Sequence, residues 1–199
     1  MGNATPLTSV KSAYHETNLK ILKAVRGLSD SQIRWQPHAT CHSIAFILWH
    51  VTRWSDHLQA TIPGMTKELS RRLPMGEQIW DKEKLAQHWG FNPDKIGESE
   101  TGTHFDIEAS GEPVWPEKNI LLDYAEQVFA AADYAISVID EEQFQEIEQP
   151  QHDSDYLKEA LAKTATVGNA LMNHLIHNAQ HLGEIDYLTG LLDQTYRHT

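Results

Sequence analysis

Apolar residues recur at three- and four-residue steps along four long stretches of this chain, with polar residues on the remaining faces. This spacing predicts amphipathic α-helices. The predicted helices cover about residues 6–28, 44–62, 116–139 and 166–192. The segments between them show no alternation of apolar and polar residues of comparable strength, so we expect no extensive sheet. The pattern therefore predicts an all-α fold, specifically a four-helix bundle.

The second predicted helix has clear signals at both ends. Ser43 precedes it and is a suitable N-cap, because a serine hydroxyl can accept a hydrogen bond from the first free N–H groups. Pro63 and Gly64 follow it and are expected to stop it. Its first half, residues 44–49, is apolar on all sides, which predicts a helix buried between its neighbours. Pro116 is expected in the first turn of the third helix.

A long irregular insertion, residues 65–116, separates the second helix from the third. Within it we expect one short helix over residues 82–89, capped by Asp81. Loops of this length inside a domain are commonly functional. A solvated connection, residues 140–153, and a short helix near 155–163 are expected before the fourth long helix. A length of 199 residues predicts a single domain spanning residues 1–199.

Composition narrows the possible partners. Lys and Arg number 16 against 28 Asp and Glu, a net charge of −12 that disfavours binding to nucleic acid. No stretch reaches the roughly 20 apolar residues that cross a membrane, so we expect no membrane partner. The single cysteine, Cys41, excludes an internal disulfide framework and a cysteine-based zinc cluster. A reducing cytoplasm is the simplest compartment.

The 12 histidines are an unusual number for a chain of this length. His174, His177 and His181 form a ridge along the edge of the apolar face expected for the last helix. That predicted face consists of Leu171, Leu175, Ala179, Leu182, Ile185 and Leu192. Imidazoles four residues apart can converge on one metal ion. The alternative is a pair of half-exposed polar residues, and a metal site would need a further ligand from elsewhere.

His50 can provide that ligand, because it shares the core-facing side of the second helix. Burying an imidazole without a partner costs about 1–3 kcal/mol. The alternative is a core histidine bonded to a carbonyl group. With His177 and His181 on another buried edge, a shared ion is the better interpretation. His57 lies two turns from His50, too far along the axis to share that ion, and we expect it at the surface or in a second site.

Two motifs resemble those of the DinB/YfiT-like superfamily. Residues 43–53 are similar to its second-helix motif, and residues 174–185 to its final-helix motif. The resemblance implies a four-helix bundle that forms a homodimer and holds a divalent ion on three histidines. By this resemblance the metal ligands are His50, His177 and His181. His174, on the same ridge of the last helix, is an alternative ligand. The implied metal is nickel, zinc or iron, and imidazole suits all three.

The resemblance also implies an activity. Three imidazoles leave a coordination position open, where a bound thiol or water becomes more acidic. Characterised members of the superfamily include metal-dependent thiol transferases that use bacillithiol or mycothiol, and a maleylpyruvate isomerase. We therefore expect a thiol S-transferase whose partners are a small thiol and an electrophile. The alternatives are a non-catalytic metal-binding dimer of the stress response and a hydrolase that uses a metal-bound water.

Four further residues have more than one interpretation each. Arg53, one turn beyond His50, could steer an anionic thiol or form a salt bridge within the bundle. Trp49 and Trp54 could line the pocket or belong to the core. Glu184, three residues after His181, could be a fourth ligand, a hydrogen-bond partner of a ligand, a base, or an acid on the helix surface.

Overall fold

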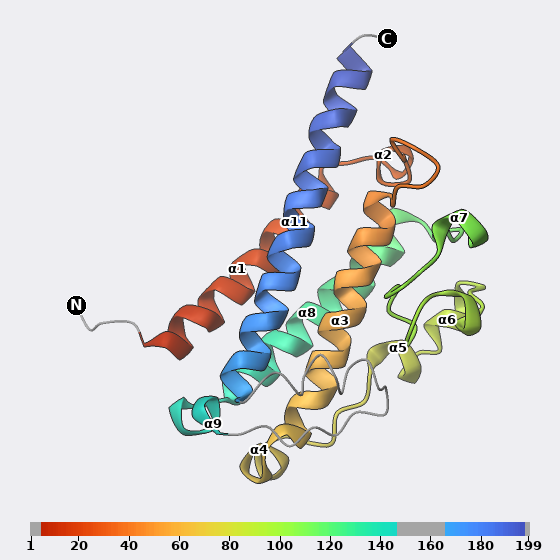
Figure 1. Cartoon of the computed structure of the whole chain (residues 1–199). Coiled ribbons are helices and arrows are strands. Elements are labelled where there is room, and N and C mark those ends of the chain that lie inside the picture. Colours follow the sequence, from red (N-terminus) through yellow and green to blue (C-terminus); the bar gives the residue numbers. More distant parts are fainter. Residues whose placement is uncertain (1–4, 147–165, 198–199) are drawn as a thin grey trace.

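Four long helices carry the fold of the computed structural model, which describes residues 5–146 and 166–197. They are α1 (Pro6–Arg26), α3 (Ile44–Met65), α8 (Lys118–Val138) and α11 (Val167–Arg197). Both α1 and α3 pack against α8 and α11 (Figure 1). The described residues contain no named strand. The predicted all-α four-helix bundle is confirmed.

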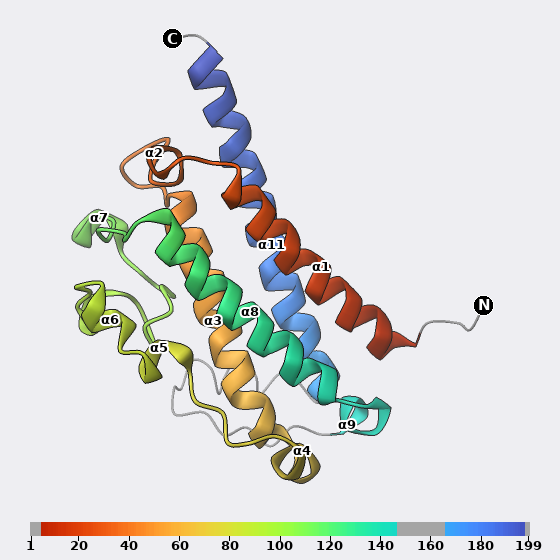
Figure 2. The ribbon, with the colours of Figure 1, turned by 180° about the vertical axis from the view of Figure 1, so that it is seen from behind.

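The order of the helices explains the long insertion. α1 and α11 run in one direction, whereas α3 and α8 run in the opposite one (Figures 1 and 2). Two consecutive long helices that run in the same direction need a long connection to return the chain to the starting end. The connection between α3 and α8 therefore crosses the length of the bundle and lies along its side.

The ends of α3 differ in how well the sequence predicted them. Ser43 Oγ accepts the N–H of Phe46 at 3.2 Å, so the predicted N-cap is confirmed. The predicted stop is wrong, because the helix continues through Pro63 to Met65. Pro63 lies in the last turn, where its missing N–H removes a single helical hydrogen bond. Burial of Ile62, Pro63 and Met65 offsets that loss.

Short helices fill the connections. They are α2 (Asp30–Ile33), α4 (Lys67–Arg72), α5 (Ile79–Lys82), α6 (Leu85–His88), the 3₁₀ turn η1 (Pro93–Lys95), α7 (Ile107–Ser110) and α9 (Glu141–Gln145). The single helix predicted over 82–89 is wrong: Lys84, at φ 51°, separates α5 from α6. The predicted helix near 155–163 lies outside the described residues.

The start predicted for the third long helix is also wrong. α8 begins at Lys118, two residues after Pro116. The N–H of Lys118 is bonded to Asp30 Oδ1 at 2.9 Å, so a side chain from α2 satisfies the free first turn. This cap comes from a distant part of the sequence, so no local pattern around Pro116 could have indicated it.

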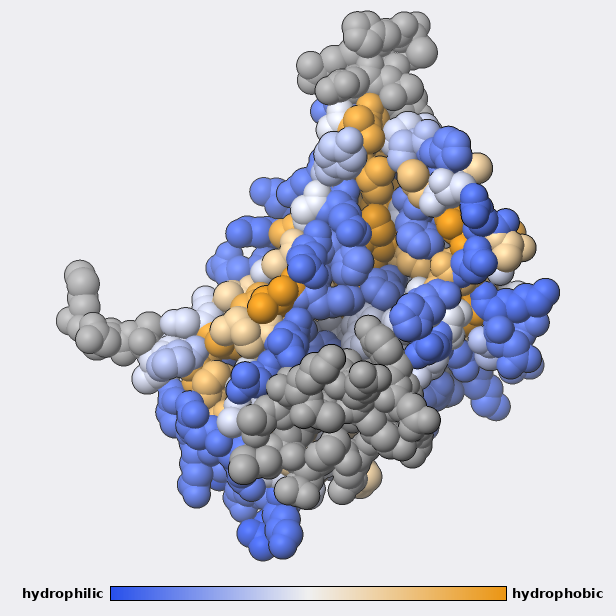
Figure 3. Space-filling view, in the orientation of Figure 1, coloured by the Kyte–Doolittle hydropathy of each residue, from blue (hydrophilic) through white to orange (hydrophobic). Residues whose placement is uncertain are grey.

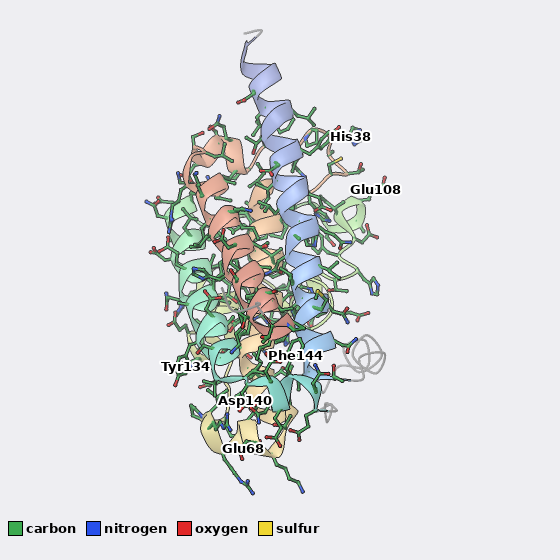
Figure 4. The ribbon with its side chains drawn as sticks, turned by 90° about the vertical axis from the view of Figure 1, so that its left-hand side faces the viewer. His38, Glu68, Glu108, Tyr134, Asp140 and Phe144 are labelled. Atoms are coloured by element: carbon green, nitrogen blue, oxygen red, sulfur yellow. The ribbon has the colours of Figure 1, made fainter. Side chains whose placement is uncertain are left out.

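The insertion is part of the core. Its side chains Trp80, Ile96 and Trp115 are buried, and the two tryptophans contact the ring of Trp49. Trp49 is only 1% exposed, which agrees with the core interpretation. At the other end of the bundle, Arg72 bonds Glu68 and Asp140, joining α4 to the start of α9 (Figure 4).

The buried face of α11 is rotated relative to the predicted one. Ala179 is exposed, whereas Asn178 and His174 are buried. Asn178 Nδ2 donates to Asn18 Oδ1 at 2.9 Å and lies 3.3 Å from Ser55 Oγ, which also accepts the Tyr14 hydroxyl. These bonds between α1, α3 and α11 decide the rotation of α11. They bring the histidine ridge from the edge of the buried face toward its centre.

In the described part of the chain, no helix combines the length and the apolar character that a bilayer crossing requires.

Candidate metal centre

Three imidazoles from two helices meet between α3 and α11. Each of His50, His177 and His181 offers a ring nitrogen, and these three atoms lie within 4.8 Å of one another. The ring centroid of His50 is 5.0 Å from that of His177 and 4.8 Å from that of His181. The Nε2 atoms of His50 and His177 are 3.1 Å apart. In the described residues this is the one group of His, Cys, Asp or Glu with such a geometry.

The spacing suits a divalent ion. Metal–imidazole bonds of about 2.0–2.1 Å at angles of about 90–110° separate the two nitrogens by about 2.9–3.4 Å. The observed 3.1 Å between the Nε2 atoms of His50 and His177 falls in that range. The rings can therefore hold a metal ion without a large movement of either helix.

Each ring turns its other nitrogen, Nδ1, toward an oxygen. His50 Nδ1 is bonded to the carbonyl of Thr101, His181 Nδ1 lies 2.7 Å from Glu184 Oε2, and His177 Nδ1 lies 3.3 Å from Asn178 Oδ1. Since these oxygens are acceptors, they favour the tautomer in which Nδ1 carries the proton and Nε2 keeps a lone pair. Lone pairs that face each other cannot form hydrogen bonds, whereas a cation between them would satisfy all three. Histidine ligands in metal sites are held in this way.

The protonation of the rings favours metal binding. Burial, followed by the charges of His177 and His181, lowers the pKa of His50 to about 3. Burial, followed by the charge of His181, lowers the pKa of His177 to about 4. Both rings are therefore neutral near pH 7, and neutral imidazole is the form that binds metal. The hydrogen bond with His181 is the largest cause that lowers the pKa of Glu184, which is therefore a carboxylate.

A strap of the insertion, residues 99–101, orients His50. Ser99 and Glu100 both have φ of 53°, a left-handed conformation that non-glycine residues rarely adopt. Arg53 holds the strap, because its Nε donates to the carbonyl of Glu100 at 2.8 Å and its Nη2 donates to that of Ser99 at 3.4 Å. The carbonyl of Thr101 is thereby placed on His50.

Arg53 itself is buried, at 1% exposure, and pairs with Asp56 at 3.3 Å. Asp56 also accepts the Tyr124 hydroxyl and the N–H of Trp80, each at 2.9 Å. The guanidinium lies 4.8 Å from the centre of the Trp80 ring. Arg53 therefore has the salt-bridge role, which was one of its two predicted alternatives. Its donors bond Asp56 and the strap, in place of the predicted anionic thiol.

Two other histidines stand apart from the three. His174 is buried one turn before His177, and its ring lies 5.8 Å from that of Trp54. His57 is partly buried, with Nε2 3.4 Å from the carbonyl of Ser99. Neither joins the group of converging nitrogens. Glu184 holds His181 and is not among the converging atoms, which corresponds to the hydrogen-bond-partner interpretation.

The three imidazoles open into a hollow of about 340 Å³. Its remaining lining residues are His42, Phe46, Ile47, Trp54, Gly102, Thr103, His104 and Glu184. Of the two tryptophans considered from the sequence, Trp54 thus lines the hollow. Sequence reasoning missed His42, whose ring stacks on Phe46 at 3.7 Å between centroids. Its place directly before the N-cap Ser43 was a local signal, because it fixes His42 at the start of α3.

Residues 102–104 carried no comparable signal, because tertiary packing alone brings them to the site. A Cβ added to Gly102 would lie 2.8 Å from Phe46, 2.8 Å from Trp49 and 3.3 Å from His50 Nδ1. Gly102 also has φ of 82°, so two independent constraints require glycine there.

Comparison with known proteins agrees with the fold. The DinB superfamily matches residues 13–185. A solved structure of a conserved protein from Enterococcus faecalis has the same fold, with a TM-score of 0.60 and 18% identity over 90% of this chain and 92% of that one. No curated protein matches the chain. Because the superfamily match covers most of the sequence, including both histidine-bearing helices, the chain belongs to the DinB superfamily.

Proposed function

We propose that this protein binds a divalent transition-metal ion on His50, His177 and His181 and uses it to transfer a small thiol to an electrophile. One observation carries the proposal: three imidazole nitrogens converge at the wall of a hollow that leaves room for a further molecule. Structural metal sites are closed by protein ligands, whereas catalytic ones keep a position open. Membership of the DinB superfamily and the three-histidine group fit a metal-binding protein.

The side chains around the imidazoles have distinct roles in this proposal. A divalent ion supplies Lewis acidity, which lowers the pKa of a thiol that it binds. Thr101 and Glu184 fix the ring orientations through Nδ1 of His50 and His181. Phe46 and Trp54 present apolar surface to the hollow, which limits water near a reacting sulfur. Nickel, zinc and iron all suit an imidazole site.

Metal content tests the ligands directly. We expect protein purified without added metal to contain a divalent ion, and His50→Ala, His177→Ala and His181→Ala each to lose most of it. His57→Ala is the matched control, because His57 is a partly buried histidine on α3 outside the group. Elemental analysis of the five proteins gives the metal-to-protein ratios. Retention near the wild-type ratio in any of the three ligand variants would contradict that assignment.

The reaction is tested with cobalt-substituted protein. Mercaptoethanol should produce a sulfur-to-metal absorption band, and the metal-loaded protein should speed its reaction with chlorodinitrobenzene. The absence of both effects would support metal binding without turnover. Hydrolysis of an activated ester in the absence of thiol would support the hydrolase instead.

The homodimer is part of the same proposal. Light scattering of the purified protein should give twice the mass of 22.6 kDa.

A further inference from the structure

A second hollow, of about 490 Å³, lies beside the histidine site. It shares His42, Ile47 and Glu184 with the first hollow. Its other lining residues are Thr40, Cys41, Gln180, Gly183, Tyr187 and Leu188. The two hollows therefore adjoin along α11 and the start of α3. Figure 3 shows apolar surface along the upper part of α11, on the side that faces α2.

The walls indicate the chemistry of a ligand. Among the residues that the structure describes, no lysine or arginine lines either hollow, and Glu184 is the one carboxylate, present in both. The chain as a whole has a net charge of −12. Ile47, Tyr187 and Leu188 provide apolar surface, and Tyr187 is 68% exposed. In the second hollow, an anionic group would meet the Glu184 carboxylate and no lysine or arginine among the described lining residues, whereas a neutral or cationic molecule with an apolar body fits.

We propose that the two hollows form one elongated site, in which the second hollow holds the apolar body of a neutral or cationic substrate while its reactive group lies at the three imidazoles. This inference rests on the proposed function for the role of the reactive group. It adds a substrate class and a binding subsite. A reaction between a thiol and an electrophile needs space for both molecules, and the adjoining hollow provides it.

Two glycines of α11 offer a matched test. Gly183 lines the second hollow, whereas Gly190, seven residues further on, lines neither hollow. Both are exposed, and a Cβ added to either meets no atom within 4 Å. Leucine is a better helix former than glycine, so Gly183→Leu and Gly190→Leu should both keep the fold. Gly183→Leu places a bulky side chain in the second hollow, and Gly190→Leu is the control.

Cys41 is a natural reporter of the second hollow, because it is the chain's single cysteine, is half-buried and lines that hollow. Its rate of modification by iodoacetamide is measured with and without phenylbutylamine, phenylbutanol or phenylbutyrate. We expect the amine and the alcohol, near saturation, to slow modification by about tenfold or more. The acid should have little effect at the same concentration. Gly183→Leu should abolish this protection, and Gly190→Leu should retain it.

Proximity to the histidine site is measured separately. In cobalt-loaded protein, the paramagnetic ion should broaden the NMR signals of bound phenylbutylamine, most strongly at the end of the molecule nearer the imidazoles. Broadening that Gly183→Leu removes and Gly190→Leu leaves unchanged would support one continuous site.

Three results would overturn the inference: protection by phenylbutyrate equal to that by the amine, equal protection in the two leucine variants, or no broadening by cobalt. Neither measurement requires thiol transfer. A protein that shows the expected protection and broadening but transfers no thiol would therefore contradict the proposed reaction and leave the subsite standing. A protein that transfers thiols but shows no such protection of Cys41 would support the proposed reaction and contradict the subsite.

Discussion

The two sides of the histidine site are held in place by different means. On the α3 side, the strap 99–101 orients His50, and the buried Arg53 and Asp56 anchor that strap to the protein interior. On the α11 side, His181 is oriented by Glu184, three residues along the same helix and 55% exposed. The orientation of His50 depends on contacts between distant segments, whereas the orientation of His181 by Glu184 depends on helical spacing.

The comparison separates two kinds of positioning. A partner at i+3 on one helix comes with the helix itself, so it adds little to the fold and can change without disturbing it. A partner on a distant strap exists only after the insertion has packed. We therefore expect changes on the α3 side to affect both stability and metal binding, and changes to Glu184 to affect metal binding alone.

The largest effect is expected from Arg53→Leu, because it leaves the fully buried carboxylate of Asp56 without its cation. Breaking a buried ion pair from one side costs about 3–5 kcal/mol in the free energy of unfolding. Metal affinity should fall as well, since the strap loses its donors. Urea unfolding and calorimetric titration with Zn²⁺ measure the two quantities.

The control for that change is Arg26→Leu, which removes an exposed ion pair with Glu126. An exposed pair contributes about 0–1 kcal/mol. Equal losses in the two variants would show that the Arg53 network does not anchor the α3 side.

Gly102→Ala should lower the free energy of unfolding by about 2–4 kcal/mol. The added Cβ is strained at a positive φ and clashes with Phe46 and Trp49. Because His50 is also within 3.3 Å of that Cβ, zinc affinity should fall too. Gly111→Ala is the matched control, since Gly111 has φ of 67° but open space around its Cβ. Gly111 also has ψ of 166°, a combination that is essentially restricted to glycine, so Gly111→Ala should lower the free energy of unfolding by about 1–3 kcal/mol with zinc affinity unchanged. Equal zinc affinities in the two variants would contradict the proposed close packing on His50.

The buried hydrogen-bonded group of Tyr14, Ser55 and Asn178 can be tested by the pH dependence of the free energy of unfolding. Burial raises the pKa of Tyr14 to about 12, above the value near 10 expected when the chain is unfolded. The unfolded chain therefore releases this proton first. The contribution of Tyr14 to the free energy of unfolding is fully present below pH 10 and is lost as the pH rises toward 12. Between pH 9 and pH 11 the loss from this group is roughly 1.4 kcal/mol.

Tyr14→Phe should lack this alkaline loss in the free energy of unfolding. Tyr187→Phe, which changes an exposed tyrosine, should keep it. Urea unfolding of the three proteins at the two pH values measures the difference. The same alkaline loss in Tyr14→Phe as in the wild type would be evidence against a buried neutral phenol.

The smallest effect on the fold is expected from Glu184→Gln. The amide can still accept from His181 but lacks the charge, so zinc affinity should fall by about tenfold. The free energy of unfolding without metal should change by less than about 0.5 kcal/mol. Asp186→Asn removes an exposed acid from the same helix and should change neither quantity. A large loss of stability in Glu184→Gln would remove the contrast between the two sides.

Prediction from the sequence succeeded where contacts are local. The periodicity of apolar residues located all four long helices, and the four-residue spacing of His177 and His181 placed two imidazoles side by side. It failed where distant groups decide. Asp30 caps α8 although it lies 88 residues before Lys118 in the chain, and the hydrogen bonds of Asn178 accompany a rotation of α11 away from the face that its leucines suggested. A hydropathy pattern identifies buried positions by their apolar residues, so it does not predict the burial of an amide that has hydrogen-bond partners.

The sequence by itself determined that the chain forms helices with apolar faces and that histidines lie along two of them. It determined these properties because helical geometry relates residues three and four positions apart, whatever the rest of the chain does. The tertiary structure alone decided that His50 meets the other two rings, that Thr101 orients it, and that Arg53 points inward. Those contacts join residues far apart in the chain, and only the packing of α3, α11 and the insertion brings them within hydrogen-bonding distance.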